Sequence, residues 1–512
     1  MEGTSILFIR KEDRFLYIKF LILTFLLYLP SFFFRDFFYP DEARNLYLCW
    51  SVSSLKQAFY LFYADEFYFH KPPLYFLLGY LLNKFSRDFL PLFLIIINIL
   101  SSGIIISLNY YFFKKEGQKE VGLLSSVVLA MTSIFYGTSI IIRMDILFYL
   151  FVVLSIFLFW WSLKENKFIL SLLAGVSGFL AVFTKGGFGF VFPLFCWIVS
   201  AVVFRRWLFL ISSTITMSLC IGGWLWWGSE VFLKDYWKIL LFKETLQKAI
   251  NPYIHKEGFF YYFIFFLPIL LPLSLFIIGY FINMIKAKEN HSWQILMSFW
   301  SIGGLVILSI VKSKLVIYLL LISLPSVALG SHFILNKGVS AKIKVNMLYA
   351  TGILLLMLFG IGSGVFFYIY RERILFLISI LGIFIFVYLL CLMYRKKSLI
   401  YKLNILLYLW FFILQIANLT YLPRISKKNG VKTLSKKIGE IKFNFDKIYT
   451  TEKPLLVLNY LYKRRPTMYV KREDLQEKLK SNKNILITKD SINYPKVEEI
   501  FTHGKFKIFK SF

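Results

Sequence analysis

Cysteine and histidine are both scarce in this sequence, with 4 and 5 residues among 512. The cysteines show neither paired spacing nor a cluster of the kind that binds metal. They are Cys49, Cys196, Cys220 and Cys391. We therefore expect no structural disulfide.

Charged residues are also few, at 17% of the sequence, whereas 58% of the residues are hydrophobic and 20% are aromatic. A soluble chain of this length has no interior large enough for so much apolar surface. The composition is that of a polytopic membrane protein. Charges are nearly absent from the middles of the long apolar runs, which argues against a coupled transporter or pump, because such proteins place ionisable groups near the midplane.

Long apolar runs provide the predicted membrane helices. A helix that crosses about 30 Å of hydrocarbon needs about 20 mainly apolar residues. Thirteen runs meet this requirement: 15–34, 89–113, 121–141, 144–163, 168–183, 187–204, 207–228, 259–285, 292–311, 314–335, 346–370, 374–394 and 400–422. We expect an all-α membrane domain over residues 1–422. The glycine-rich GIGSG at 360–364 lies inside one run with no preceding strand, so we expect it to permit close helix packing rather than to bind phosphate.

Lysine and arginine are unevenly divided between the loops. With the amino terminus in the cytoplasm, most loop cations, such as Lys114, Arg205 and Lys396, fall on the inner side. Thirteen crossings then place two long loops, residues 35–88 and 229–258, on the outer side together with the carboxyl-terminal region. The first apolar run lacks a small-residue cleavage site, so we expect a retained helix rather than a removed signal peptide.

Residues 423–512 differ from the rest in composition, with 22 Lys and Arg against 9 Asp and Glu. Strand-like DKIYTT, PTMYVK and NILITKD alternate with helix-like PLLVLNYLYK and REDLQEKLKS. We expect a small α/β domain on the outer side. Attraction to anionic membrane lipids fits its charge better than nucleic acid does, and a solvated basic surface is the plain alternative.

Ionisable residues gather at the predicted outer ends of the helices. They come from several separate loops: Asp41, Glu42, Arg44, Asp65, Glu66, His70, Lys71, Asp145, Lys185, His255, Lys256, Lys312 and Lys314. Their convergence predicts one active site at the membrane interface, where a substrate leaves its tail in lipid and presents its head to the protein.

Asp41 and Asp145 are two carboxylates of this predicted site. Asp41 and Arg44 are three residues apart on one helical face, with Glu42 pointing elsewhere. A paired arginine keeps Asp41 ionised, as a general base requires. The alternatives are that Asp41 merely favours the start of an interfacial helix after Pro40, and that Asp145 is a boundary acid tethered by Arg143.

His70 and Lys71 precede two prolines and an apolar run of about 12 residues, too short to span a bilayer. Lys71 could hold a phosphate. The topology leaves His70 and His255 in outer loops, where they could share a divalent metal, but zinc sites ordinarily need three or four ligands. Polar loop histidines without a metal are the alternative.

Two further segments carry interfacial cations. The loop 229–258 has the spacing of a helix that lies on the membrane surface. In VKSKLVIYLLLISLP, Lys314 and Tyr318 are four residues apart and would face one cavity on a helix. Snorkelling to the membrane surface explains either Lys312 or Lys314 singly. Together with Lys71 and Lys185 they make four cations at one level of the membrane, and binding of a polyanionic headgroup explains this set better than snorkelling does.

A family resemblance follows from the ordered motifs PDEAR, HKPPLYF, RMDILFYL, FTKGG, IHKEGFFYYF and SKLVIYLLLISLP. Their order and spacing, over about residues 15–335, resemble the membrane glycosyltransferases of the GT-C class, in particular the lipid A aminoarabinose transferase and protein O-mannosyltransferase-like family. Residues beyond 340 match only in layout.

The resemblance implies roles for individual residues. The acidic pair Asp41 and Glu42 would lie in the catalytic cavity, with Arg44 positioning Asp41 and Asp145 as the second carboxylate. The residues implied to hold the lipid-linked phosphate are Lys71, Lys185, Tyr318, Lys314 and Lys256, of which Lys256 stands in for an arginine that the family has after its histidine. His70 takes the place of the family's usual glutamate and would share zinc or another divalent metal with His255.

The resulting hypothesis is an inverting transfer of sugar from a polyprenyl-phosphate donor to an envelope acceptor, with lipid A as the leading candidate acceptor. Nucleotide sugars are cytoplasmic, so no nucleotide is expected. Two alternatives remain: a protein O-glycosyltransferase that uses the same donor class, and a polyprenyl-phosphate or lipid transporter.

Overall fold

The computed structural model describes residues 11–64, 66–231, 234–240, 250, 255–286, 291–371, 373–395, 398–441, 445–462, 465–479, 483–492 and 497–511. Its contacts divide the chain into two compact units. The helical unit contains Met1–Tyr28, Asn98–Ser139 and Asp145–Ala417, and the loop-and-sheet unit contains Leu29–Ile97, Ile140–Met144 and Asn418–Phe512. The predicted loop 35–88 therefore groups with the carboxyl-terminal region rather than with the membrane helices.

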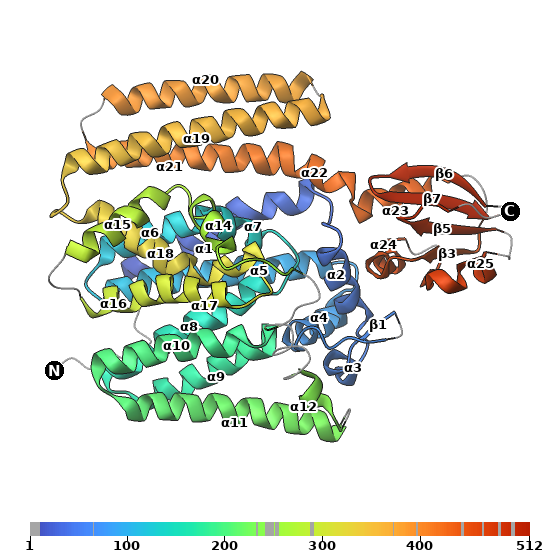
Figure 1. The fold of residues 1–512 in the computed structure, drawn as a ribbon, viewed down its shortest axis with the longest axis horizontal. Coiled ribbons are helices and arrows are strands. Elements are labelled where there is room, and N and C mark those ends of the chain that lie inside the picture. Colours follow the sequence, from blue (N-terminus) through green and yellow to red (C-terminus); the bar gives the residue numbers. More distant parts are fainter. Residues whose placement is uncertain are drawn as a thin grey trace. The chain divides into compact units, whose positions relative to one another are not determined.

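The membrane helices of Figure 1 coincide with the predicted apolar runs. They are α1 (Lys11–Phe34), α5 (Leu90–Lys115), α6 (Lys119–Met131), α7 (Ser133–Ser139), α8 (Asp145–Glu165), α9 (Phe168–Lys185), α10 (Phe188–Phe204), α11 (Trp207–Val231), α14 (Tyr261–Ile269), α15 (Ser274–Lys286), α16 (Ser292–Ser298), α17 (Gly304–Ile310), α18 (Ser323–Leu335), α19 (Ala341–Tyr370), α20 (Arg373–Arg395) and α21 (Leu399–Ile416). A π-helical turn, η2 (Phe299–Gly303), joins α16 to α17, and a 3₁₀ helix, η3 (Val316–Ile322), leads into α18.

The count of crossings is lower than the thirteen predicted. Within the described residues, ten helices are long and apolar enough to cross a membrane, or up to twelve if each bent pair is one span. The bent pairs are α6 with α7, at 60°, and α14 with α15, at 114°. Pro272 lies in the second break, where its missing N–H cannot continue a helix. The remaining predicted run, 187–204, corresponds to α10, an apolar helix shorter than the other spans.

Small residues allow close packing in the core of the helical unit. Phe159, Ala174, Trp197 and Met217, from four successive helices, form one buried cluster. A Cβ added to Gly175 of α9 would lie 2.6 Å from the backbone oxygen of Ser213 in α11, so only glycine permits this approach. The GIGSG of α19 is different, because a Cβ added to any of its glycines meets no described atom within 4 Å. The expectation of close helix packing there is wrong.

The loop-and-sheet unit begins with short elements after α1. These are α2 (Asp41–Ser51), α3 (Leu55–Phe59), the two-stranded hairpin β1 (Phe62–Tyr63) and β2 (Glu66–Phe67), and α4 (Leu74–Phe85). The predicted short helix after the double proline is thus confirmed as α4, which has 12 residues. Of the predicted surface helix in 229–258, the structure describes the end of α11 and α12 (Tyr236–Lys238); most of the remaining loop lies outside the described residues.

The carboxyl-terminal part of this unit is a small domain with one five-stranded sheet, and its α/β fold class is the one predicted from the sequence. Its elements are π-turn η4 (Ala417–Tyr421), α22 (Leu422–Lys428), α23 (Val431–Gly439), β3 (Lys447–Thr450), η5 (Lys453–Val457), α24 (Leu458–Leu461), β4 (Thr467–Tyr469), η6 (Arg472–Asp474), α25 (Leu475–Lys478), β5 (Asn484–Thr488), β6 (Val497–His503) and β7 (Phe506–Ser511). The strand order is β4-β3-β5-β7-β6, with β4, β3 and β5 parallel and β7 antiparallel to both of its neighbours.

Three of the five strands follow the sequence prediction, and β6 and β7 do not. Every residue of central β5 is buried, so its apolar run indicated a strand. Strand β6 lies at the sheet edge with most of its residues partly or fully exposed, and it therefore lacks a clear apolar alternation. One buried cluster of the sheet domain contains Tyr449, Val470, Leu486 and Phe509.

Candidate active site

Adjacent carboxylates at the start of α2 point to different partners. Successive side chains on a helix are rotated by about 100°, so Asp41 and Glu42 cannot share one environment. Glu42 is 1% exposed, whereas the side chain of Asp41 is 36% exposed. The first-turn placement itself follows the sequence prediction, with Pro40 at the N-cap and both acids near the positive end of the helix.

Glu42 is held entirely within the protein. Its two carboxylate oxygens accept hydrogen bonds from the Arg35 guanidinium at 2.6 and 2.7 Å, and both side chains are 1% exposed. The same oxygens accept the backbone N–H groups of Phe38 at 2.7 Å and Ile142 at 2.6 Å. With four donors on one buried carboxylate, Glu42 ties the segment after α1 to residue 142. This geometry favours a positioning role over direct catalysis.

Asp41 has the opposite character, with a partly exposed carboxylate between two guanidinium groups. Arg44 Nη2 and Arg143 Nη1 each donate to a different Asp41 oxygen, both at 2.6 Å. The predicted pairing of Asp41 with Arg44 is confirmed. Arg143 also binds Asp41. Two guanidinium groups thus bind one carboxylate.

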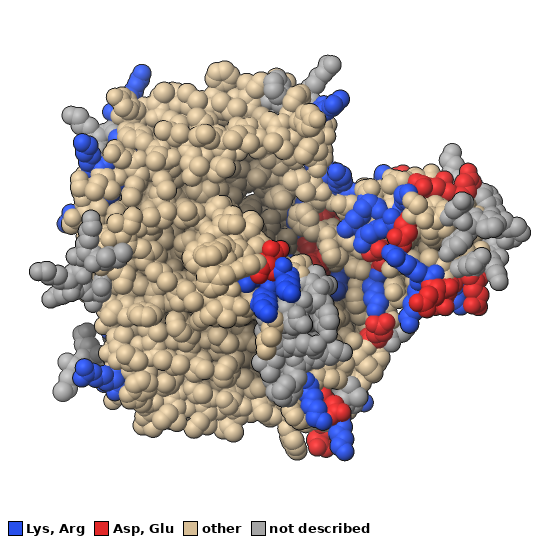
Figure 2. Space-filling view, in the orientation of Figure 1, with Lys and Arg blue, Asp and Glu red and all other residues tan. Residues whose placement is uncertain are grey.

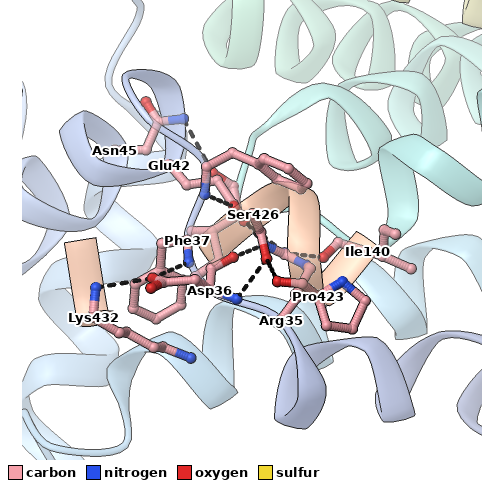
Figure 3. Close-up of polar contacts among 11 residues, drawn as sticks. Arg35, Asp36, Phe37, Glu42, Asn45, Ile140, Pro423, Ser426 and Lys432 are labelled. Atoms are coloured by element: carbon pink, nitrogen blue, oxygen red, sulfur yellow. Dashed lines mark hydrogen bonds and ion pairs between the residues drawn. The ribbon is translucent and has the colours of Figure 1, made fainter. Parts of the chain in front are cut away.

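Asp36 anchors this segment to the sheet domain (Figure 3). Its oxygens accept the backbone N–H groups of Lys432 at 2.9 Å and Thr433 at 2.8 Å, and the Thr433 hydroxyl at 2.7 Å. These N–H groups belong to the first turn of α23, so Asp36 acts as an N-cap supplied by a distant segment. A Cβ added to Gly430 would lie 2.1 Å from Asp36 Oδ2, and glycine is therefore required there.

Further contacts reinforce the same anchor. The backbone N–H of Asp36 donates to the Ser426 hydroxyl at 2.9 Å, and the Lys432 ammonium lies 4.0 Å from the centroid of the Phe37 ring. Burial lowers the pKa of Lys432, with Asp36 acting against that shift. The sequence prediction missed Arg35 and Asp36, although two charges flanked by phenylalanines in FFFRDFF were a usable signal of buried pairing.

His70 and Lys71 lie between hairpin β1–β2 and α4. The His70 ring is exposed and meets the Tyr68 ring edge-on at 5.2 Å, and Lys71 is half-buried just before Pro72 and Pro73. The double proline fixes the backbone where α4 begins, with Pro73 at its N-cap. Lys71 is thus carried on a constrained turn, as a phosphate ligand would need to be.

The helical unit contains a second charged group. Asp145, the first residue of α8, forms a buried ion pair with Lys185, the last residue of α9. The Lys185 ammonium also lies 4.5 Å from the centroid of the Tyr318 ring and 5.4 Å from that of Phe148. The structure thus brings Asp145, Lys185 and Tyr318 together. Because Lys185 is already paired with a carboxylate, its charge is largely compensated.

A short β-bridge joins the segments around His255 and Lys314. Lys256 pairs with Ser313, and the Lys314 N–H donates to the His255 carbonyl at 3.0 Å. Lys314 is 2% exposed, donates its ammonium to the Val311 carbonyl, and has its pKa lowered by burial.

Contrary to the sequence prediction, Lys314 and Tyr318 do not share one face of a helix. Helix η3 begins only at Val316, so Lys314 lies in the extended segment before it, and Tyr318 turns toward Lys185 instead.

The predicted metal ligands do not form a complete metal site by themselves. No three or more His, Cys, Asp or Glu residues of the described chain are grouped so that they could hold a metal ion. His70 and His255 belong to different units, and His255 adopts a positive φ of 64°. A two-histidine site stays a prediction, and we derive no chemical step through a metal.

Comparisons with known proteins agree with the observed architecture. The family model for dolichyl-phosphate-mannose-protein mannosyltransferase matches residues 92–235. An uncharacterized protein of Aquifex aeolicus is 25% identical over 60% of each chain. The undecaprenyl phosphate-alpha-4-amino-4-deoxy-L-arabinose arabinosyl transferase of an Enterobacter species is 24% identical over 63% of this chain and 60% of its own. The match thus spans about three fifths of these curated relatives.

The whole chain has a counterpart among solved structures. The crystal structure of ArnT from Cupriavidus metallidurans bound to undecaprenyl phosphate superposes with a TM-score of 0.77, at 13% identity, over 98% of both chains. The fold is therefore that of this solved structure, with a helical membrane domain and a small carboxyl-terminal sheet domain. The resemblance predicted from the motifs is confirmed: this chain is similar in sequence to aminoarabinose transferases and shares the fold of one.

Proposed function

We propose that this protein is an integral-membrane glycosyltransferase that moves a sugar from a polyprenyl-phosphate donor to an envelope acceptor. The observation that carries the proposal is the Asp41 carboxylate held between Arg44 and Arg143 at the start of α2. The matches to an arabinosyl transferase and to a structure that binds undecaprenyl phosphate support the donor class.

The charge around Asp41 favours an anionic acceptor. Two guanidinium groups bind this one carboxylate. Guanidinium groups are also the side chains that bind phosphate in bidentate fashion, so an anionic acceptor group would find ligands here. An acceptor phosphate is already a nucleophile and needs no deprotonation, so a phosphorylated glycolipid such as lipid A fits this site. A hydroxyl acceptor would instead give its proton to Asp41.

The reaction is an inverting displacement at the anomeric carbon. An acceptor oxygen forms the new bond while the bond between the anomeric carbon and the donor phosphate oxygen breaks, and polyprenyl phosphate departs with the electron pair. We assign Lys71 and Lys256 to stabilise that phosphate, because cations near the departing oxygen lower the barrier. Asp145, Lys185 and Tyr318 support the donor indirectly, through the packing of α8, α9 and η3. Buried Lys314 stabilises the segment that leads into η3.

The membrane placement is also part of the proposal. Cations in the predicted inner loops favour a cytoplasmic amino terminus, with Asp41 and the sheet domain on the outer side of a bacterial inner membrane. A cysteine placed at exposed Phe62 should react with a membrane-impermeant reagent in intact spheroplasts. Labelling only after lysis would overturn this orientation.

The transfer reaction is tested with the purified chain in lipid. Labelled polyprenyl-phosphate sugar and lipid A should yield labelled lipid A, and Asp41→Asn should abolish transfer while the protein keeps its thermal stability. Lys164→Gln is a matched control, because Lys164 pairs with Glu116 at 2.8 Å near the end of α8 opposite to Asp145. An Asp41→Asn variant with full activity would remove Asp41 from the mechanism.

The second candidate is a protein O-glycosyltransferase that uses the same donor class. The match of residues 92–235 to the protein mannosyltransferase family model favours it. Mass spectrometry of envelope lipids and secreted proteins from cells with and without the gene separates the two. A sugar mass lost from glycolipid supports the first proposal, and one lost from Ser or Thr of proteins supports the second.

A further inference from the structure

The sheet domain has the topology of a ligand-binding α/β domain. The chain runs from β3 to edge strand β4 and then returns past β3 to β5, so the strand order reverses at β3. In open parallel sheets, ligands bind outside the carboxyl ends of strands where the order reverses. At the carboxyl ends of these strands, Thr451 and Glu452 follow β3 and Lys489 follows β5. The Thr451 hydroxyl donates a hydrogen bond to the Thr488 hydroxyl at 2.8 Å.

A cluster of one tyrosine, one carboxylate and two lysines occupies this edge. The Tyr39 hydroxyl donates to Glu452 Oε2 at 2.5 Å, and Lys489 forms an ion pair with the same oxygen. The Lys505 ammonium lies 4.1 Å from the centroid of the Tyr39 ring, and that of Lys489 lies 5.0 Å away. Tyr39 directly precedes Pro40 and Asp41, so the cluster is continuous with the catalytic segment in sequence.

The charges of this cluster are not balanced. Glu452 compensates Lys489, whereas Lys505 forms no ion pair with any carboxylate of the described residues. Burial lowers the pKa of Lys505, the neighbouring Lys489 lowers it further, and Glu452 opposes these effects. Both ammonium groups lie against the same Tyr39 ring. An anion bound between the two ammonium groups would relieve this repulsion and gain charge-assisted hydrogen bonds. Figure 2 shows how densely charged side chains gather on the sheet domain, in contrast to the largely uncharged face of the helices.

We propose that Tyr39, Lys489 and Lys505 form an anion subsite that binds an acidic headgroup of phosphate chemistry. This inference rests on the proposed function for its occupant, the phosphorylated glycolipid acceptor. The subsite would hold one phosphate of the acceptor while the reacting group approaches Asp41. The sheet domain would thereby select acceptors that carry a second acidic group.

The first test measures binding without catalysis. The full chain is placed in nanodiscs of zwitterionic lipid, and binding of lipid A is compared with binding of its dephosphorylated form. Lys505→Gln should weaken binding of the phosphorylated form about tenfold, as expected for one lost charge-assisted bond, and Lys505→Arg should restore it. Lys510→Gln is the matched control, because it removes a cation of β7 that is already paired with Glu498, at 2.8 Å. Equal binding of both lipid forms, or equal losses in both Gln variants, would overturn the subsite.

A second arm separates the two sources of the phosphate. If the subsite binds the acceptor, adding phosphatidylglycerol to the nanodiscs should leave the affinity of the chain for lipid A within about twofold. Strong competition by phosphatidylglycerol would assign the cluster to the membrane surface and overturn its role in acceptor binding. Binding of an acceptor peptide that is lost in Lys505→Gln would likewise contradict it.

Kinetics distinguish failure of this inference from failure of the proposed function. Lys505→Gln should raise the KM for acceptor and leave the KM for donor unchanged. A wild-type chain that transfers no sugar refutes the proposed function, while the binding comparison still decides whether the subsite exists. A wild-type chain that transfers sugar, with an unchanged acceptor KM in Lys505→Gln, refutes the subsite alone.

Discussion

Glu42 provides the sharpest test of how the site is held together. Its carboxylate accepts four hydrogen bonds, two of them from Arg35, in a place where both side chains are 1% exposed. In Glu42→Gln, the amide nitrogen replaces an oxygen that accepts two donors. Both donors lose their acceptor, and the Arg35 guanidinium is left buried without a counter-charge.

The expected cost follows from these contacts. An orphaned buried donor costs about 1–3 kcal/mol, and breaking a buried ion pair by removing one partner costs about 3–5 kcal/mol. We therefore expect Glu42→Gln to lower the free energy of unfolding of the loop-and-sheet unit by roughly 3–5 kcal/mol. Asp41→Asn, by contrast, breaks ion pairs of a carboxylate that is 36% exposed and should cost about 1 kcal/mol or less per pair.

The assay combines thermal unfolding of the purified protein with hydrogen exchange of the peptide 35–45. Glu42→Gln should unfold at a lower temperature and exchange faster in this peptide, whereas Asp41→Asn should do neither and yet lose transfer. The double variant Arg35→Met, Glu42→Leu removes both charges and should recover much of the stability. A Glu42→Gln protein as stable as wild type but inactive would refute the positioning role and make Glu42 a catalytic residue.

Three more outcomes follow from the described contacts. Gly430→Ala forces a Cβ to within 2.1 Å of Asp36 Oδ2, so it should loosen α23 and raise protease sensitivity, whereas Gly360→Ala, in open space, should not. Burial lowers the pKa of His503 below its ordinary 6.5, Lys437 lowers it further, and the Gly430 carbonyl and Asp36 oppose this shift. The stability that neutral His503 contributes is therefore complete above pH 6.5 and is lost as the pH falls below it. His503→Gln should make the melting temperature less dependent on pH in this range. Asp145→Asn leaves the Lys185 ammonium buried without its counter-charge and should cost about 3–5 kcal/mol, and recovery of the melting temperature in Asp145→Asn, Lys185→Met would separate this packing role from a catalytic one.

The sequence by itself determined the membrane architecture and the local elements around the site. Hydrophobic length is a local property, so each predicted run coincides with helix, and the turn chemistry of Pro40 and of Pro72 and Pro73 correctly placed the starts of α2 and α4. The pairing of Asp41 with Arg44 was equally accessible, because residues three apart on a helix are neighbours. The bent spans and the edge strand β6 were less accessible, since their form depends on packing.

Only the tertiary structure decided which charge meets which. Asp41 reaches Arg143 across 102 residues, and Asp36 reaches Thr433 across 397. Buried charges must find partners, but neither composition nor periodicity says which partner lies near once the chain has folded. For that reason Glu42 proved to be bound by Arg35, Asp145 by Lys185, and Tyr39 by a carboxylate of the distant sheet domain.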